Sequence, residues 1–238
     1  MRPARLLLFL LFPIALNAAS LPSGLVPTEI EGVVRILGFP AVTRLLRSAE
    51  AYKPWPGIKV GGEVTISSTQ DLATLGDKNG SVPQFTLLPR LYLSKGLFSE
   101  LELILSTFPI RDPVGVATIG GILKWTFYQE KETWLSAAAY FGYTRVYAFH
   151  SDYVGNDVEF GIYFSKDWVR LKPFLGAAML FAEGSVRPVL AKTAATSALQ
   201  STLHTFLGAE WEFPLNLGFQ VDLMNLTPMG SLFIGKKF

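Results

Sequence analysis

Between Lys59 and the terminal Phe238, the chain repeats short stretches in which every second residue is apolar and the intervening residues are mixed, several of them charged. In residues 97–105, for example, leucine occupies most odd positions, while Glu100 and Glu102 point the other way. This period of two is typical of a β-strand with one apolar face. About ten such stretches follow one another without a long helix between them, so the pattern predicts an all-β membrane protein with alternate residues facing lipid.

Turn signals such as Asp77-Lys78-Asn79-Gly80 and Lys95-Gly96 divide this pattern into strands. Residues 184–200 are small and polar and are expected to form a long loop. A count of about 8 or 12 strands in place of about ten stays open where the alternation is weak. The strands are expected at residues 58–68, 85–94, 97–107, 116–128, 134–147, 154–165, 169–182, 203–213, 217–224 and 231–238.

The first 19 residues predict a secretory signal peptide. Arg2 and Arg5 precede an apolar run over residues 6–12, and small residues around Ala18 and Ala19 suit cleavage. A transmembrane anchor is the alternative, but the run is shorter than the roughly 20 residues that a spanning helix needs. The mature chain is therefore expected to be exported.

Residues 20–56 predict a short N-terminal helical segment ahead of the barrel at residues 57–238. Apolar residues recur at helical spacing after Pro27, with Thr28 as a candidate cap, until Gly38-Phe39-Pro40 breaks the pattern. A second helix is expected over residues 40–52, with Arg44, Arg47 and Glu50 on its polar side. The segment has three candidate positions: inside the barrel as a plug, on the periplasmic membrane face, or against a partner. A plug or periplasmic cap is favoured because the lumen is adjacent.

The signal peptide, the alternating hairpins and the final strand, which ends in Phe238, resemble a small bacterial outer-membrane β-barrel protein. The resemblance implies an antiparallel up-and-down transmembrane β-barrel in the outer membrane, surrounded by membrane lipids and lipopolysaccharide. Phe238 resembles the signal read by the barrel-assembly machinery. Odd-numbered connections include the longer ones and even-numbered connections are short, which predicts that the N- and C-termini both lie in the periplasm. The match is to an architecture, and it leaves the oligomeric state open.

If apolar positions face lipid, the charged positions between them face the lumen. Charges of both signs occur there in similar number, which favours paired networks in a narrow or filled barrel over a wide pore. The predicted lumen residues are Lys59, Glu63, Arg90, Glu100, Glu102, Lys124, Asp157, Glu159, Arg170, Lys172, His204, Glu210, Glu212, Asp222 and Lys237. Lys236 falls on the outer face, where a long side chain near the interface can reach water.

All five tryptophans lie near connections that are expected on the periplasmic side. Indole rings favour the membrane interface, and barrels carry aromatic girdles there. The predicted girdle consists of Trp55, Trp125, Trp134, Trp168 and Trp211.

Composition excludes several function classes. The 238 residues contain no cysteine, so neither disulfides nor thiolate metal sites can form. The formal charge of +2 shows no basic excess of the kind that nucleic-acid binding requires. Neither metal-ligand spacing nor a phosphate-binding glycine loop occurs, and no cofactor is expected.

The weak catalytic candidates are the two histidines. His150 is followed by Ser151 and Asp152, but neighbours in sequence rarely converge as nucleophile, base and orienting group. His204 is expected inside the barrel. The sequence therefore favours a small channel or a structural or surface-interaction barrel, with a lipid-modifying enzyme or a hydrophobic-compound transporter with an N-terminal hatch as alternatives.

Overall fold

Ten antiparallel strands close into a barrel in the computed structural model, which describes residues 19–51, 55, 57–98, 100–108, 116–130, 133–225 and 227–238. Each strand pairs with its neighbour in sequence, and β1 pairs with β10 to close the ring. This confirms the predicted antiparallel up-and-down barrel of about ten strands. The strands are β1 (Ile58–Ser68), β2 (Phe85–Gly96), β3 (Leu101–Thr107), β4 (Ala117–Glu130), β5 (Leu135–Ala148), β6 (Tyr153–Lys166), β7 (Leu171–Val186), β8 (Ser197–Glu212), β9 (Asn216–Met224) and β10 (Thr227–Lys237).

The strands alternate between buried and exposed positions, as the period of two requires. In β2, Leu87, Leu91 and Leu93 are exposed on the outer face, whereas Arg90 and Tyr92 are buried inside. The same arrangement, apolar outside and polar inside, recurs along β6 and β9. A soluble barrel would show the reverse arrangement, so this exterior is typical of a barrel surrounded by lipid.

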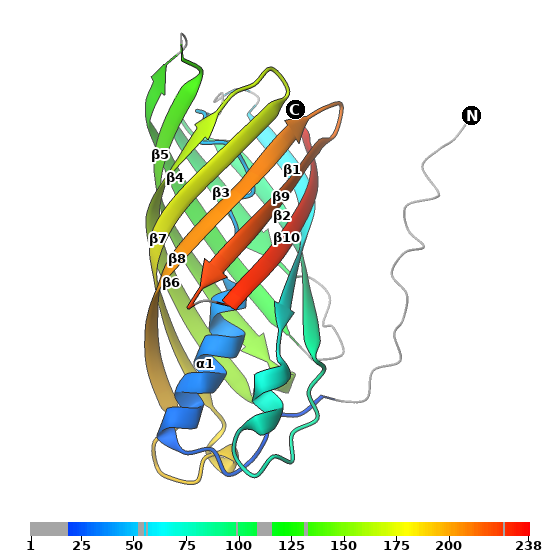
Figure 1. Cartoon of the computed structure of the whole chain (residues 1–238), viewed down its shortest axis with the longest axis vertical. Coiled ribbons are helices and arrows are strands. Elements are labelled where there is room, and N and C mark those ends of the chain that lie inside the picture. The colour runs from blue at the N-terminus through cyan, green and yellow to red at the C-terminus, as the bar shows by residue number, and fades with distance from the viewer. Residues whose placement is uncertain are drawn as a thin grey trace, which may run out of the picture.

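The two ends of the barrel differ. We call the end that holds the even-numbered connections and the C-terminus the turn rim, and the opposite end the loop rim (Figure 1). The loop rim carries the long connections 69–84 and 187–196, which contain the short 3-10 helices η1 (Gln70–Thr74) and η3 (Pro188–Leu190). A third, η2 (Phe149–Ser151), joins β5 to β6. Strands β4 to β8 are longer than the others, so the wall is taller on that side at the loop rim.

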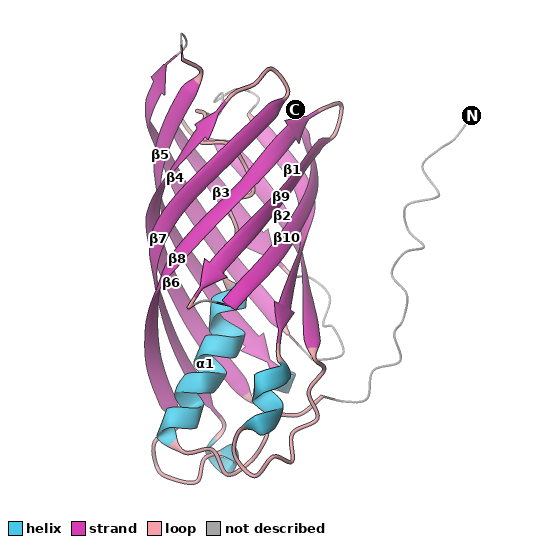
Figure 2. Ribbon diagram, in the orientation of Figure 1, coloured by secondary structure: helices cyan, strands magenta, loops and turns pink. Residues whose placement is uncertain are grey.

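Helix α1 (Pro27–Ala41) enters the barrel from the loop rim, and residues 42–51 continue inside it to the turn rim (Figure 2). Before the helix, Ser20 bonds to Ser81 and Leu25 to Leu190, both in loop-rim connections. At the other end of the molecule, the Phe238 amide bonds to Ile58 at the start of β1. The described N-terminal end and the C-terminus therefore lie at opposite rims, in disagreement with the prediction that both lie on one side of the membrane.

The predicted helix break and second helix are wrong. Helix α1 runs through Gly38-Phe39-Pro40 to Ala41, and residues 42–51 are not helical. Pro40 has no amide to donate to the Ile36 carbonyl, and the helix ends one residue later, at Ala41. The helix begins at Pro27 with Val26 as its N-cap, not Thr28, and the Glu29 carboxylate accepts a hydrogen bond from the Val26 amide at 2.9 Å.

Several strand boundaries also differ from the prediction. Strand β3 begins at Leu101, not at residue 97, because β2 runs on to Gly96 and a turn follows in which the Leu97 amide bonds to Leu101. Strands β7 and β8 extend into the expected loop of residues 184–200, which shortens it to 187–196. The signal peptide lies outside the described residues apart from Ala19. Among the helices that the structure describes, none is both long and apolar enough to cross a membrane.

Candidate functional site

The interior of the barrel is occupied by residues 27–51, which we call the plug. Its helical part fills the lumen near the loop rim with apolar side chains. Ile30, Val33 and Val34 are 0% exposed and belong to one hydrophobic cluster with wall residues that include Tyr153 and Leu180. Burial of each such side chain contributes about 1.5–3 kcal/mol, so this packing holds α1 against the taller wall.

Arg90 of β2 caps the C-terminal end of α1. Its guanidinium donates hydrogen bonds to the carbonyl oxygens of Pro40, Ala41 and Val42 at 2.8 to 3.1 Å. The same group donates to the Glu63 carboxylate of β1 at 2.6 Å. The last carbonyls of a helix lack partners within the helix and carry partial negative charge, so a buried cation satisfies them.

Beyond the C-terminal end of α1, Arg44 of the plug reaches a cluster of charged side chains on the wall. Its Nε lies 3.2 Å from the Asp222 carboxylate of β9, and both side chains are fully buried. The other Asp222 oxygen lies 2.8 Å from His204 Nε2, and His204 Nδ1 contacts Glu159 of β6. This cluster therefore connects the plug to three strands of the wall, β9, β8 and β6.

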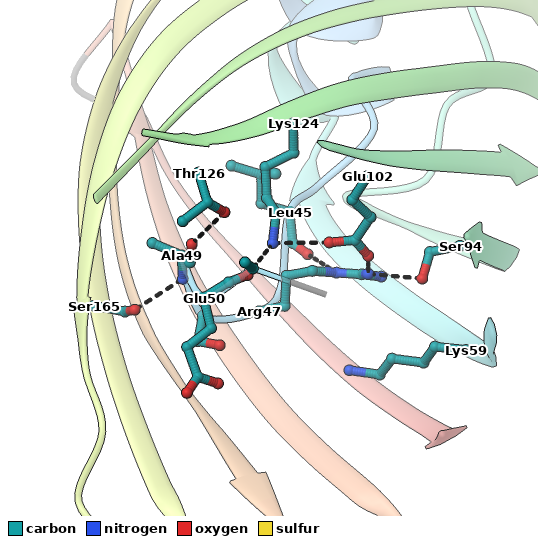
Figure 3. A network of polar contacts seen from close by, with 12 residues as sticks. Leu45, Arg47, Ala49, Glu50, Lys59, Ser94, Glu102, Lys124, Thr126 and Ser165 are labelled. Carbon is teal, nitrogen blue, oxygen red and sulfur yellow. Dashed lines mark hydrogen bonds and ion pairs between the residues drawn. The ribbon is translucent and has the colours of Figure 1, made fainter. Parts of the chain in front are cut away.

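Arg47 makes the next connection toward the turn rim (Figure 3). Its guanidinium pairs with Glu102 of β3 and donates a hydrogen bond to Ser94 of β2 at 2.8 Å. Lys124 of β4 also pairs with Glu102, at 2.8 Å, and donates to the Glu50 carbonyl at 2.6 Å. Buried charges are stable only when paired and hydrogen-bonded, and each of these has at least one partner of opposite sign.

The backbone of residues 43–51 is bonded by wall side chains instead of by a helix or sheet. Five of its amides donate to side-chain oxygens of the wall, and three of its carbonyls accept from side chains of the wall. The amides are those of Thr43, Leu46, Ser48, Ala49 and Ala51, which donate to Thr144, Gln220, Glu210, Ser165 and Gln129. The carbonyls are those of Ser48, Ala49 and Glu50, which accept from Tyr163, Thr126 and Lys124. Buried backbone groups need such partners, and the wall supplies them in place of a second helix.

At the turn rim, lysines close the network. Lys59 pairs with Glu210 at 2.5 Å, and Lys172 pairs with Glu50 of the plug and lies 3.2 Å from Glu212. A small polar hollow of about 20 Å³, open to solvent, lies here between the end of the plug and the wall. The lumen is therefore filled along its length by the plug and ends in a shallow vestibule at the turn rim.

Most of the residues predicted to face the lumen are buried inside the barrel. These are Lys59, Glu63, Arg90, Glu102, Lys124, Asp157, Glu159, Lys172, His204, Glu210 and Asp222. Glu100 and Arg170 are exposed in turns, so their predicted position is wrong; the parity of a strand does not extend past its end. Glu212 and Lys237 lie at the turn rim, half-buried and exposed respectively, and approach each other to 3.4 Å.

The sequence pattern did not identify three functional side chains of the plug itself. Arg44, Arg47 and Glu50 were placed on the polar side of a second helix without partners, whereas the structure bonds them to wall residues of opposite charge. The charges of the predicted lumen residues could have indicated the missing cations, because that set contained more acids than bases. Two arginines from elsewhere in the chain restore that balance.

The two histidines named as weak catalytic candidates lie in different surroundings. His150 is exposed in the β5–β6 connection. Both ring nitrogens of His204 are bonded to carboxylates, so no hydroxyl nucleophile is activated there. The described residues also contain no group of three or more acidic or imidazole side chains arranged to hold a metal ion.

The five tryptophans lie near the turn rim. The five tryptophans are all exposed, from 50% to 84%, and four of them lie in or beside the turn-rim connections of β2–β3, β4–β5, β6–β7 and β8–β9. Trp55 precedes β1 at the same rim. Phe238 is 57% exposed beside them. These rings form a belt on the outer surface at one end of the barrel.

No protein-family model matches the chain, and no curated protein matches it in sequence. Three solved structures are similar at low level. A loop-deletion mutant of OmpT, an outer membrane protein of Vibrio cholerae, is 8% identical over 64% of this chain and 54% of that one, with a TM-score of 0.32. Neisserial surface protein A is 13% identical over 76% and 97%, with a TM-score of 0.24. Ail, the attachment invasion locus protein of Yersinia pestis, is 10% identical over 76% and 94%, with a TM-score of 0.27.

This chain spans about half the length of the OmpT mutant, 54%. TM-scores this low carry no argument about function. The fold rests on the pairing of the chain's own strands.

Proposed function

We propose that the protein is an integral outer-membrane β-barrel whose lumen is closed by its own N-terminal segment, and that it acts as a structural or surface-interaction protein rather than as an open channel. The observation that carries this proposal is the bonding of residues 43–51, whose backbone amides and carbonyls are held by side chains of the strands β4, β5, β6, β8 and β9. A segment held at so many points is part of the folded barrel and not a loose occupant.

The outer surface supports the membrane location. Large apolar side chains cover it from the tryptophan belt at the turn rim toward the loop rim. Toward the loop rim, this apolar zone ends at a row of polar side chains on the outer face of β5, β6 and β7. It consists of Arg145, Asn156 and Glu183, which face one another in register. An apolar zone between two polar or amphipathic limits matches the hydrocarbon layer of a bilayer.

The orientation follows from loop length. Short turns of outer-membrane barrels face the periplasm, so the turn rim and Phe238 are periplasmic. Residues 19–26 then lie at the outer surface, where Ser23 bonds to Asp77 and Asn79, and Lys192 bonds to the Leu25 carbonyl. The chain crosses the membrane once inside its own barrel. The N-terminal end, the β1–β2 loop and the β7–β8 loop together form the surface cap.

Cysteine labelling tests this arrangement, because the chain has no cysteine of its own. Ser20→Cys marks the surface cap and Lys237→Cys marks the turn rim; both positions are exposed. A membrane-impermeant maleimide applied to intact cells should label the Ser20→Cys variant and leave Lys237→Cys unlabelled until the outer membrane is permeabilised. Equal labelling of both variants in intact cells, or labelling of Lys237→Cys alone, would refute the proposed orientation.

Uptake of apolar molecules through an N-terminal hatch is the second candidate. An apolar hollow between α1 and the strands β1, β2 and β5, lined by side chains such as Leu37, Leu88 and Val146, is the observation in its favour, but the volume of this hollow is about 10 Å³, room for about one water molecule. The closed barrel is favoured because the part of the plug between this hollow and the turn rim is bonded to the wall.

A further inference from the structure

Three cations at the turn rim each lie over an aromatic ring on the outer surface. Lys95 Nζ is 5.6 Å from the centre of the Trp55 ring. Arg170 Cζ is 5.1 Å from the Phe213 ring, and Lys236 Nζ is 5.2 Å from the Phe238 ring. We call these three cations the basic arc. Lys95 follows the exposed Leu91 and Leu93 at the same strand parity, and Lys236 likewise continues the outer face of β10, so both point toward the surrounding membrane.

The basic arc occupies one continuous side of the rim. In the closed strand order, β2, β1 and β10 are neighbours, followed by β9, β8 and β7. Backbone bonds connect these strand ends: Gly96 to Gly57, Phe238 to Ile58, and Glu212 to Arg170. The three cations therefore line the rim from the end of β2 to the β6–β7 turn.

Two described acids on this side of the rim, Glu212 and Asp167, lie close to lysines on its inner side or end. Glu212 lies 3.2 Å from Lys172 and 3.4 Å from Lys237, and Asp167 lies 3.6 Å from Lys172. The charge of these acids is therefore balanced by those lysines, whereas Lys95, Arg170 and Lys236 lie over rings on the outer side. Glu100 and Glu130 lie instead near the ends of β3 and β4, on another part of the rim.

We propose that the basic arc binds the phosphate group of anionic glycerophospholipids in the membrane leaflet around the turn rim. The proposal rests on the membrane location proposed above. Aromatic rings at the interface hold each cation at the depth of the lipid headgroups. Lysine and arginine donate charge-assisted hydrogen bonds to phosphate oxygens, and the acyl chains of the same lipid lie on the apolar face beside them, at Leu93 and Ile234. A zwitterionic headgroup brings its own cation, so an anionic lipid is preferred.

Native mass spectrometry of the full chain in detergent tests the proposal, with added phosphatidylglycerol, phosphatidylcholine or inorganic phosphate as the probe. The test variant carries Lys95→Gln, Arg170→Gln and Lys236→Gln together. The control variant carries Arg35→Gln, Lys78→Gln and Lys192→Gln, which likewise removes one arginine and two lysines, all exposed and at the loop rim. Both variants must first show the heat-dependent gel mobility of a folded barrel.

The wild-type chain and the control variant should retain phosphatidylglycerol in preference to phosphatidylcholine, and the test variant should bind phosphatidylglycerol at least roughly tenfold more weakly. Equal retention of the two lipids by the wild type, or unchanged retention by the test variant, would overturn the proposal. Competition by inorganic phosphate alone at the same concentration would assign the site to free phosphate and not to lipid. Lipid binding in detergent does not depend on the orientation of the protein in the membrane. A negative result for lipid binding therefore leaves the labelling test of the proposed function unaffected.

Discussion

Phe233 of β10 lies across Gly218 of β9, its partner in the sheet, because glycine leaves room for the ring. The ring is buried, packs edge-on against Tyr92 at 6.3 Å and lies under the Lys59 ammonium at 4.8 Å. A Cβ added at Gly218 would lie 1.6 Å from the ring, so any side chain there displaces it. Single side chains of this kind set the shape of the narrow lumen.

We expect Gly218→Ala to destabilise the barrel by about 1–3 kcal/mol, because the Phe233 ring must move into a filled lumen. Urea unfolding followed by tryptophan fluorescence measures the change. Gly230→Ala is the matched control, since Gly230 lies in the paired strand and a Cβ there meets nothing within 4 Å. Equal stability of the two variants would show that the contact of Phe233 with Gly218 is not a constraint.

Arg90 is the second residue whose removal is informative, since it joins α1, β1 and β2. Arg90→Gln leaves the buried Glu63 carboxylate without its cation and should cost about 3–5 kcal/mol in the free energy of unfolding. Adding Glu63→Gln should recover part of this loss, because an uncharged pair needs no counterion. A double variant as unstable as Arg90→Gln alone would show that the helix carbonyls, and not Glu63, account for the effect.

At the residue scale, the sequence predicted most of the interior because the alternation of a strand is a local property. Glu63, Glu102 and Asp222 were placed inside from parity alone, and they are buried. Glu100 and Arg170 were misplaced because they lie in turns. The partners of the interior residues could not be predicted, since Leu46 and Gln220, for example, are 174 positions apart in sequence.

At the scale of elements, the plug shows how tertiary contacts override a local pattern. Residues 40–52 have apolar and polar positions at helical spacing, yet the structure describes them up to Ala51 without a second helix. A helix would bond the backbone to itself, whereas the wall side chains Gln220, Glu210 and Ser165 compete for its amides. These wall residues are distant in sequence from the plug, so the local pattern of residues 40–52 could not predict their hydrogen bonds. The strands, whose pattern is local and repeated, were predicted nearly to their ends.

Arg44 and Arg47 are the charged connections of this element to the wall. Replacing both with methionine removes the cations opposite Asp222 and Glu102, although His204 and Lys124 remain near those acids. We expect the plug to lose roughly 2–4 kcal/mol of its attachment. A cysteine at Ala49, which is fully buried in the wild type, reports this loss as maleimide labelling that is at least roughly tenfold faster.

The control for this experiment replaces Arg35 and Arg187 with methionine in the same Ala49→Cys background. Both are exposed, and Arg187 makes a surface pair with Asp152 at 3.0 Å. Surface pairs contribute little, so labelling should stay at the rate of the parent. If the Arg44 and Arg47 variant labels no faster than this control, the two arginines do not hold the plug.

For the whole molecule, the structure and the sequence-based prediction differ in the path of the chain. The sequence indicated a barrel with both ends in the periplasm, because loop lengths report the direction of the strands and not the path of a segment that precedes them. The structure places Ser20 and Phe238 at opposite rims, so the plug runs the length of the lumen. An apolar helix near one rim and a paired polar network toward the other close the same interior in two different ways.

Single-channel conductance in planar lipid bilayers tests the closed lumen most directly. The chain from residue 20 to Phe238 is compared with a variant that lacks the plug, residues 27–51, and that keeps the heat-dependent gel mobility of a folded barrel. We expect the full chain to insert without measurable conductance and the shortened chain to give discrete current steps. Steps of equal size from both proteins would contradict the account, and so would a folded shortened barrel that conducts no current.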